Sequence, residues 1–342
     1  MRARLEELLA SGRTVLADGA TGTNLFAEGL TSGEPPEFWL ETHPDRVRRL
    51  HRRFVDAGAD VILTDSFGAN ARRLALHGAA HRAYELSRLA AATAREVADA
   101  APRPVVVAGS VGPTGELFAP LGALTHDDAV ATFTDQIRGL RDGGADVAWI
   151  ETMSAPEEVR AAAEAAIACG MPYVATCSFD TAGRTMMGLA PATLAGVFDG
   201  LAVAPLAMGA NCGVGASDLL VSVLEISRGA GTLPVVAKGN CGIPRFVGTE
   251  ISYSGTPELM ARYAAMAIDA GARIVGGCCG TTPEHLAAMR RAVDAHARGA
   301  APSVEDVVRE IGPLTNSAPS VSEPRPASEG ARRGRAGRRG DR

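Results

Sequence analysis

Three cysteines stand where the chain could bind a metal ion. Cys278 and Cys279 are adjacent in "GGCCGTTPEH", just after the apolar run "ARIV", and Cys212 ends a second apolar run, "PLAMGANC". Adjacent cysteines are poor disulfide partners, because closing the ring strains the peptide bond between them. The chain has no C-x-x-C pair of the kind found in structural zinc sites and thioredoxins. The three cysteines are therefore metal ligands or small buried side chains, and the flanking glycines favour a metal.

The other cysteines are weaker candidates. Cys241, in "KGNCGIP", is an alternative third ligand, because it also follows an apolar run. Cys169 ends a helical pattern, and Cys177 lies within an apolar run where any small apolar residue would serve. On the residues alone, the choice between Cys212 and Cys241 stays open.

Three thiolates are typical of Zn²⁺ with one coordination position left for a substrate. The thiolates give such a site a net negative charge, which weakens the activation of water and makes hydrolysis a poor use of the metal. A thiol substrate suits the site better, because a bound metal deprotonates the thiol near neutral pH and leaves the thiolate reactive. We therefore expect Zn²⁺ as the cofactor and alkyl transfer to sulfur as the chemistry.

Eight short apolar runs, each followed by a pattern of helical period, must position these cysteines. Near-continuous apolar strands indicate burial on both faces, as in a parallel sheet covered by helices. Eight such units predict an α/β protein with a single (β/α)8 TIM-type barrel. The competing doubly wound sheet lacks its G-x-G-x-x-G motif after the first run. The runs cover residues 14–20, 59–67, 104–112, 145–152, 172–179, 205–212, 233–240 and 272–279.

The helices between the runs carry start and stop signals. Residues 43–58, 125–144 and 256–271 have apolar residues at helical spacing. Thr125 is placed to begin the second of these helices, and Gly271 to end the third.

In such a barrel, the residues that end the strands converge on one face, where these enzymes keep their active sites. On the residues alone, Asp18 is equally well explained as a helix cap, and Glu151 as the buried partner of a basic side chain. The polar residues at the predicted strand ends are Asp18, Asp65, Glu151, Asn211, Cys212, Asn240, Cys278 and Cys279.

Composition sets the class of protein. Hydrophobic residues make up 46% of the 342 residues and aromatic residues 4%, with 39 glycines, which is typical of an α/β enzyme and not of a disulfide-stapled chain. The apolar runs are far shorter than a membrane span, and the start "MRARLEELLA" lacks the apolar core of a secretory signal. We expect a cytoplasmic protein with reduced cysteines and no membrane partner.

The last residues differ from the rest in composition. We expect the barrel to occupy residues 1–312 and to be followed by a disordered Arg/Pro/Ser-rich tail at 313–342. The tail holds seven arginines against three acidic residues, and a basic tail can touch nucleic acid. It has no aromatic residue to stack on bases and little to pack, so we expect no nucleic-acid partner.

Six motifs carry a family resemblance: "LADGATGT", "GADVILTDSFGAN", "GSVGPTGE", "GADVAWIET", "GANCG" and "GGCCGTTPEH". With them the chain resembles, over residues 12–298, the homocysteine S-methyltransferase family, and the last two motifs are highly specific as a pair. The resemblance implies a (β/α)8 barrel whose zinc is held by Cys212, Cys278 and Cys279, and it removes Cys241 from the ligand set.

The resemblance also implies how homocysteine is held. Asp18 and Glu151 would pair with the substrate ammonium, and the backbone amides of Gly19, Ala20, Thr21 and the two following residues would receive its carboxylate. Asn211 would orient its neighbours and the substrate without binding the metal.

The methyl donor is less well defined. Betaine enzymes of the family hold a quaternary ammonium in an aromatic cage, and two positions of that cage are Gly68 and Thr152 here. The segment "GGCCGTTPEHLAAMRRAV" is more similar in sequence to the methionine synthase module of the family. The chain has no Asp-x-His-x-x-Gly cobalamin motif, however. We expect a small onium donor, glycine betaine first, held near Asp65 by Trp39 and Phe67.

Other hypotheses stay open. Methylcobalamin on a separate carrier protein, or S-methylmethionine, could be the donor, and a zinc- or thiol-sensing regulator could use the same barrel. A Schiff-base enzyme would need Lys238, the only lysine, which is equally well explained as a salt-bridge partner in the barrel mouth. The expected partners are homocysteine and a small methyl donor, with a homo-oligomer and a cobalamin carrier as further options.

Overall fold

The structure, a computed structural model, describes residues 4–242, 244–247 and 250–315. Eight parallel strands form one sheet in the order β1-β10-β7-β6-β5-β4-β3-β2. A parallel bridge between Ala17 and Val61 brings the two edge strands together, so that the sheet forms a nearly closed barrel. The strands are β1 (Val15–Leu16), β2 (Val61–Leu63), β3 (Val106–Val111), β4 (Val147–Met153), β5 (Tyr173–Cys177), β6 (Ala207–Cys212), β7 (Val235–Gly239) and β10 (Ala272–Gly277). Each overlaps one of the eight predicted runs, which confirms the TIM-type barrel.

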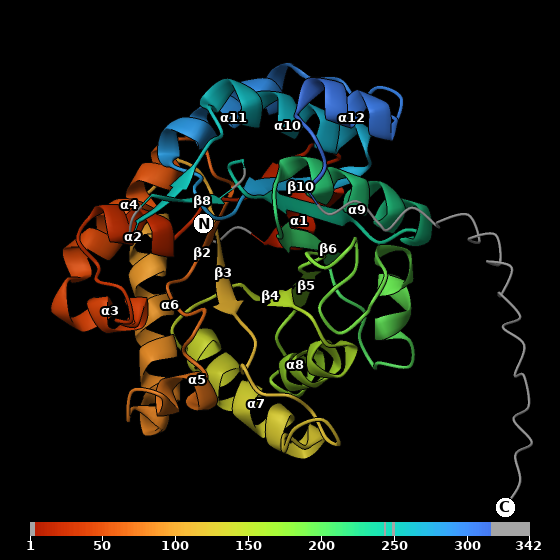
Figure 1. Cartoon of the computed structure of the whole chain (residues 1–342). Coiled ribbons are helices and arrows are strands. Elements are labelled where there is room, and N and C mark those ends of the chain that lie inside the picture. The colour runs from red at the N-terminus through yellow and green to blue at the C-terminus, as the bar shows by residue number, and fades with distance from the viewer. Residues whose placement is uncertain (1–3, 243, 248–249, 316–342) are drawn as a thin grey trace, which may run out of the picture.

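Helices surround the strands (Figure 1). As predicted, the side chain of Thr125 caps α7 (His126–Asp142) by accepting from the amide of Asp128, and Gly271 follows α10 (Pro257–Asp269) with φ of 110°. Between β5 and β6 the chain forms only the 3₁₀ segment η3 (Pro191–Phe198) in place of the expected α-helix. No described helix is long and apolar enough to cross a membrane. The remaining elements are α1 (Leu5–Ala10), α2 (Gly22–Ala27), η1 (Pro36–Phe38), α3 (Trp39–Thr42), α4 (Pro44–Asp56), α5 (Ala71–Ala75), η2 (Ala80–Arg82), α6 (Ala83–Asp99), α7 (His126–Asp142), α8 (Pro156–Ala168), α9 (Ala216–Gly229), α10 (Pro257–Asp269), α11 (Pro283–Ala295) and α12 (Val304–Glu310).

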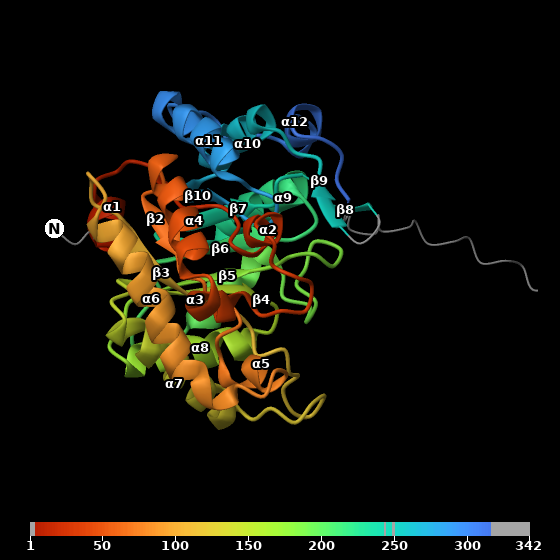
Figure 2. The same ribbon diagram turned by 90° about the vertical axis from the view of Figure 1, so that its left-hand side faces the viewer.

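The core has two layers. Inside the barrel, strand side chains such as Val61, Trp149 and Ile274 form one cluster, which Leu5 of α1 joins. A larger cluster fills the space between the strands and the outer helices. In Figure 2, α1 lies at one end of the barrel and the strands β8 (Pro244–Val247) and β9 (Glu250–Tyr253) lie at the other. The apolar cluster therefore fills the barrel below the polar residues that end the strands.

Two features lie outside the predicted elements. Strands β8 and β9 pair as an antiparallel hairpin between β7 and α10. Beyond α12, the hydroxyl of Ser217 donates to the carbonyl of Gly312 (2.9 Å), and the amide of Thr315 donates to the carboxylate of Asp218 (3.0 Å). The chain thus packs on α9 as far as residue 315, three residues past the expected boundary. The rest of the predicted tail, residues 316–342, lies outside the described residues.

His51 of α4 gives the stability of the protein a defined dependence on pH. Its side chain is 1% exposed, and burial lowers its pKa from 6.5 to about 4. The folded state keeps the ring neutral while the unfolded chain binds a proton, so stability present at neutral pH is lost as the pH falls from 6.5 towards 4. In urea titrations, we expect the wild type to lose about 2 kcal/mol more than His51→Leu between pH 7 and pH 5. Equal losses in the two proteins would rule out a buried neutral ring.

Candidate active site

The three predicted cysteines come together at the mouth of the barrel. Cys212 ends β6 and Cys278 follows β10, and these two strands lie on either side of β7. The Sγ atoms of Cys212 and Cys279 are 3.9 Å apart, and all three sulfur atoms lie within 4.8 Å of one another. A tetrahedral zinc ion with Zn–S bonds of about 2.3 Å separates its sulfur ligands by about 3.8 Å. The cluster therefore fits zinc both in ligand type and in spacing.

Cys241 does not belong to this cluster. Its amide donates to the carbonyl of Cys279 (2.9 Å), so its backbone lies close by. Its side chain is fully buried and packs against Gly255, where an added Cβ would lie 2.7 Å from the Cys241 sulfur. Burial raises the pKa of this thiol to about 12, so it stays neutral. Cys212 is thus the third member of the cluster, and Cys241 is a core residue.

Left-handed backbone at two strand ends shapes the cluster. Cys212 has φ of 61° and Thr152, after Glu151, has φ of 62°. Residues other than glycine seldom adopt this conformation, and those that do are concentrated at functional sites. Asn211 links the two turns, because its Oδ1 accepts from the amide of Thr152 (2.8 Å) and its Nδ2 donates to the hydroxyl of that residue (2.7 Å).

Asn211 has no capacity left for a substrate. Its Oδ1 also accepts from the hydroxyl of Thr176 (2.7 Å), and its Nδ2 lies 3.9 Å from the sulfur of Cys278. The side chain is 1% exposed and is not among the residues that line the cavity described below. The structure therefore places Asn211 behind the cavity wall, where it positions Thr152 and Cys278.

Hydrogen bonds between the thiols shift their pKa values. Hydrogen bonds from Cys212 and Cys278 lower the pKa of Cys279 to about 3, while donation to Cys278 and Cys279 raises the pKa of Cys212. The cluster by itself thus favours a single thiolate that two thiols stabilise. A divalent cation would offset the repulsion between thiolates and allow all three to ionise.

A buried ion pair lies beside the cysteines. The ammonium of Lys238 donates to Oδ1 of Asp18 (2.9 Å) and to the carbonyl of the same residue (3.1 Å). Oδ2 of Asp18 accepts from the amide of Leu63 (2.7 Å), so the carboxylate is not a helix cap. Burial alone would lower the pKa of Lys238, but Asp18 and Glu151 together raise it. Lys238 is therefore the salt-bridge partner that the sequence allowed, which argues against a Schiff-base role.

Of the two predicted carboxylates, Glu151 accepts fewer hydrogen bonds than Asp18. Its Oε1 accepts from the hydroxyl of Ser110, and burial raises its pKa to about 7 while Lys238 opposes that shift. Glu151 and Ser110 line the cavity, whereas Asp18 does not. Glu151 therefore faces the cavity, whereas Asp18 is bound to Lys238.

A cavity of about 590 Å³ opens above these groups. The cavity is large enough for two small molecules. The three cysteines line it together with the loop of Gly19, Ala20 and Thr21. Gly19 of that loop packs closely, since an added Cβ would lie 2.6 Å from the carbonyl oxygen of Thr281. The lining includes Gly19, Ala20, Thr21, Glu151, Lys238, Cys212, Cys278 and Cys279.

Of the residues expected to bind the methyl donor, two line the cavity and one does not. Phe67 and Asp65 line the cavity. Trp39 does not: it is 1% exposed, its indole nitrogen donates to Glu34 (3.1 Å), and Arg46 lies over its ring. Helix α3 turns the indole towards the core, so Trp39 does not belong to the cavity wall, where the donor cage was expected.

Sequence reasoning missed several residues of the cavity. Glu37 and Arg73 line it without belonging to a strand end, and Tyr253 enters it from the hairpin, where a hydrogen bond from its hydroxyl helps to lower the pKa of Cys279. No motif identifies these residues, because Glu37 and Arg73 lie on short helices and Tyr253 ends a hairpin strand, and the position of each element depends on packing.

The comparisons with known proteins point to one family. The family described as "Homocysteine S-methyltransferase" matches residues 15–293. Methionine synthases of Mycobacterium tuberculosis and Mycobacterium leprae are 32% and 31% identical over 299 and 305 residues, which is 83% and 84% of this chain. The chain spans only 25% of the length of each of these relatives.

A solved structure extends the match. The metallated form of the homocysteine methyltransferase MmuM from Escherichia coli is similar with a TM-score of 0.71 and 25% identity, covering 84% of this chain and 99% of that one. The range matched by the family, residues 15–293, contains all three clustered cysteines as well as Asp18 and Glu151. The chain therefore belongs to the homocysteine S-methyltransferase family.

Proposed function

We propose that the protein transfers a methyl group from a small onium donor, glycine betaine first, to the sulfur of homocysteine and so forms methionine. The observation that carries the proposal is the set of three sulfur atoms at zinc spacing on the wall of a cavity that also holds buried carboxylates. Cys212, Cys278 and Cys279 would hold the ion, leaving one position for the substrate sulfur.

Zinc, when bound, would supply a Lewis acid that keeps the homocysteine sulfur as a thiolate at neutral pH. The transfer itself is a displacement: the sulfur forms a bond to the methyl carbon, the bond from that carbon to the onium nitrogen breaks, and its electron pair stays on the nitrogen of dimethylglycine. No general base is required, because the proton of the thiol leaves before the transfer. The chain contributes by holding the two reactants in line.

The homocysteine end of the cavity has groups for both charges of an amino acid. Glu151 faces the cavity and would accept the substrate ammonium, with Asp18 held beside it by Lys238. The loop of Gly19, Ala20 and Thr21 lines the same cavity and would offer backbone amides to the carboxylate. In the reducing cytoplasm, where we place the protein, the cysteines would remain available as thiolates.

The donor is tested by parallel incubations. Zinc-loaded protein and homocysteine are mixed separately with glycine betaine, S-methylmethionine, dimethylsulfoniopropionate and free methylcobalamin, and methionine is measured. We expect methionine with betaine. Turnover only with methylcobalamin would overturn the onium donor and favour a separate cobalamin carrier, and turnover only with S-methylmethionine would replace betaine by that donor. Binding of homocysteine with proton release, but no methionine from any donor, would favour a thiol-sensing regulator.

A further inference from the structure

The cavity has a second charged region, apart from the groups that would hold homocysteine. It is formed by η1, by the segment after β2 and by α5. Two acidic side chains and one basic side chain from these elements line the cavity: Glu37, Asp65 and Arg73. None of these three residues is adjacent in sequence to a cysteine of the cluster, and none takes part in the ion pair of Lys238 and Asp18.

No positive side chain of the described residues lies in direct contact with either carboxyl group. Glu37 and Asp65 are each 4% exposed. Glu37 accepts from the amide of Gly68, but Oδ2 of Asp65 is buried and has no hydrogen-bond partner among the described residues. Burial raises the pKa of Asp65, and the nearby charge of Glu37 raises it further. A buried carboxyl oxygen without a hydrogen-bond partner lowers the stability of the folded protein. A cationic ligand would provide the missing partner for this pair of carboxyl groups.

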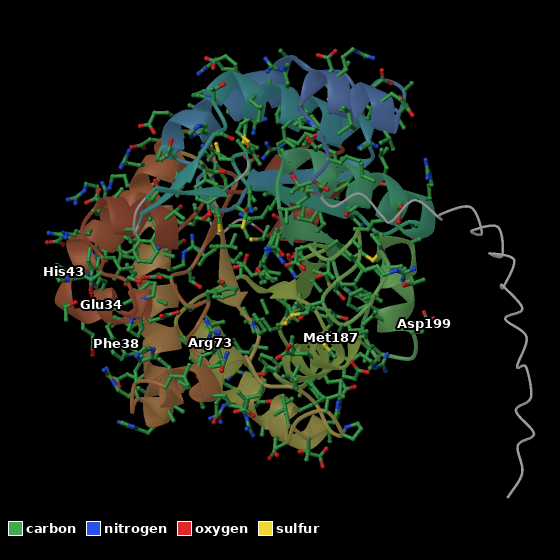
Figure 3. The ribbon with its side chains drawn as sticks, in the orientation of Figure 1. Glu34, Phe38, His43, Arg73, Met187 and Asp199 are labelled. Atoms are coloured by element: carbon green, nitrogen blue, oxygen red, sulfur yellow. The ribbon has the colours of Figure 1, made fainter. Side chains whose placement is uncertain are left out.

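Arg73 provides the opposite charge. It forms no ion pair within 4.0 Å in the described part of the chain, although its charge lowers the pKa of Glu37. Its neighbour Arg72 points elsewhere and binds Glu116 (2.6 Å) and Asp128 (3.7 Å). In Figure 3, Arg73 lies to the right of Glu34 and Phe38, on their barrel side. A guanidinium that lines a cavity without an ion pair is suited to bind a carboxylate in two-point contact.

We propose that this region is a clamp for a zwitterion, in which Arg73 binds the carboxylate of the methyl donor while Glu37 and Asp65 face its onium group. The inference rests on the proposed function and narrows it, because the donor must carry both charges a few bonds apart. A simple cation leaves Arg73 without a partner. A purely anionic donor meets Glu37 and Asp65 and is repelled. Arg73 is then the residue that selects donors with a carboxylate.

The test compares two ligands with the same quaternary nitrogen. Binding of labelled glycine betaine and of tetramethylammonium, which lacks the carboxylate, is measured by equilibrium dialysis with zinc-loaded protein. Methionine is present to fill the homocysteine position without offering a free thiol. We expect Arg73→Gln to weaken betaine binding about tenfold or more and to leave tetramethylammonium binding unchanged. Asp65→Asn weakens both ligands.

Arg72→Gln is the matched control, because the same change is made one residue away and outside the cavity. It should bind both ligands as the wild type does. Betaine binding that survives in Arg73→Gln, an equal loss for both ligands, or a wild type that binds no betaine would each overturn the clamp. Methionine formation is measured separately. If the wild type forms methionine from betaine and Arg73→Gln binds betaine as the wild type does, the clamp alone is refuted. If both ligands show the expected binding pattern but no donor gives methionine, the proposed function alone is refuted.

Discussion

Replacing Cys279 with alanine is expected to remove both the metal and the activity. Two remaining thiolates hold zinc far less tightly than three, so Cys279→Ala should fall from one zinc per chain to less than about a tenth of that. Methyl transfer should drop at least about a thousandfold, since the substrate sulfur is then no longer activated. Zinc is measured by mass spectrometry after desalting, and methionine formation is measured on the same samples. Cys212→Ala and Cys278→Ala should behave in the same way.

Cys241→Ala is the matched control for this series. The residue is a cysteine within one hydrogen bond of Cys279, yet its sulfur packs against Gly255 and not towards the cluster. The variant should keep its zinc and its activity and lose only a small amount of stability from the truncated core side chain. Full zinc in Cys279→Ala, or loss of zinc in Cys241→Ala alone, would show that the ligand set is wrong.

Lys238→Met is expected to lose about 3–5 kcal/mol of stability, because it leaves the carboxylates of Asp18 and Glu151 buried without their cation. The side chains of Lys238 and Asp18 are 2% and 1% exposed, so water cannot replace the missing charge. Adding Asp18→Asn to the variant removes one of the stranded charges and should recover part of the loss. The free energy of unfolding is measured by urea denaturation at pH 7 for both single variants and for the double variant.

Arg49→Met is the control for this cycle. Arg49 pairs with Glu28 at the surface and its side chain is 51% exposed, so its removal should change the stability by less than about 0.5 kcal/mol. A Lys238→Met protein as stable as the wild type would mean that Lys238 is not charged in the folded state. Additive losses in the double variant would mean that Lys238 and Asp18 do not interact.

The sequence alone determined the barrel and the place of its site. Eight apolar runs, each followed by a helical pattern, are local signals, and all eight became strands. Because parallel strands of a barrel end on one face, the polar residues after those runs had to meet there, although Asp18 and Cys279 are far apart in sequence. The residues also identified Cys278 and Cys279 as candidate ligands, since adjacent cysteines between glycines have few other uses, whereas they left Cys212 and Cys241 as alternatives for the third position.

Only the tertiary structure decided which side chains face one another. Cys212 and Cys241 both follow strands, but the left-handed backbone at Cys212 and the packing of Gly255 on Cys241 put one sulfur into the cluster and the other into the core. Likewise, Trp39 is as aromatic as Phe67, yet α3 turns it inward. The pattern of residue types gives the period of a strand or a helix, whereas the direction of a side chain beyond the end of that element depends on contacts distant in sequence. Glu37, Asp65 and Arg73 come from three such segments, and their meeting in one cavity is set by how these segments pack around the barrel.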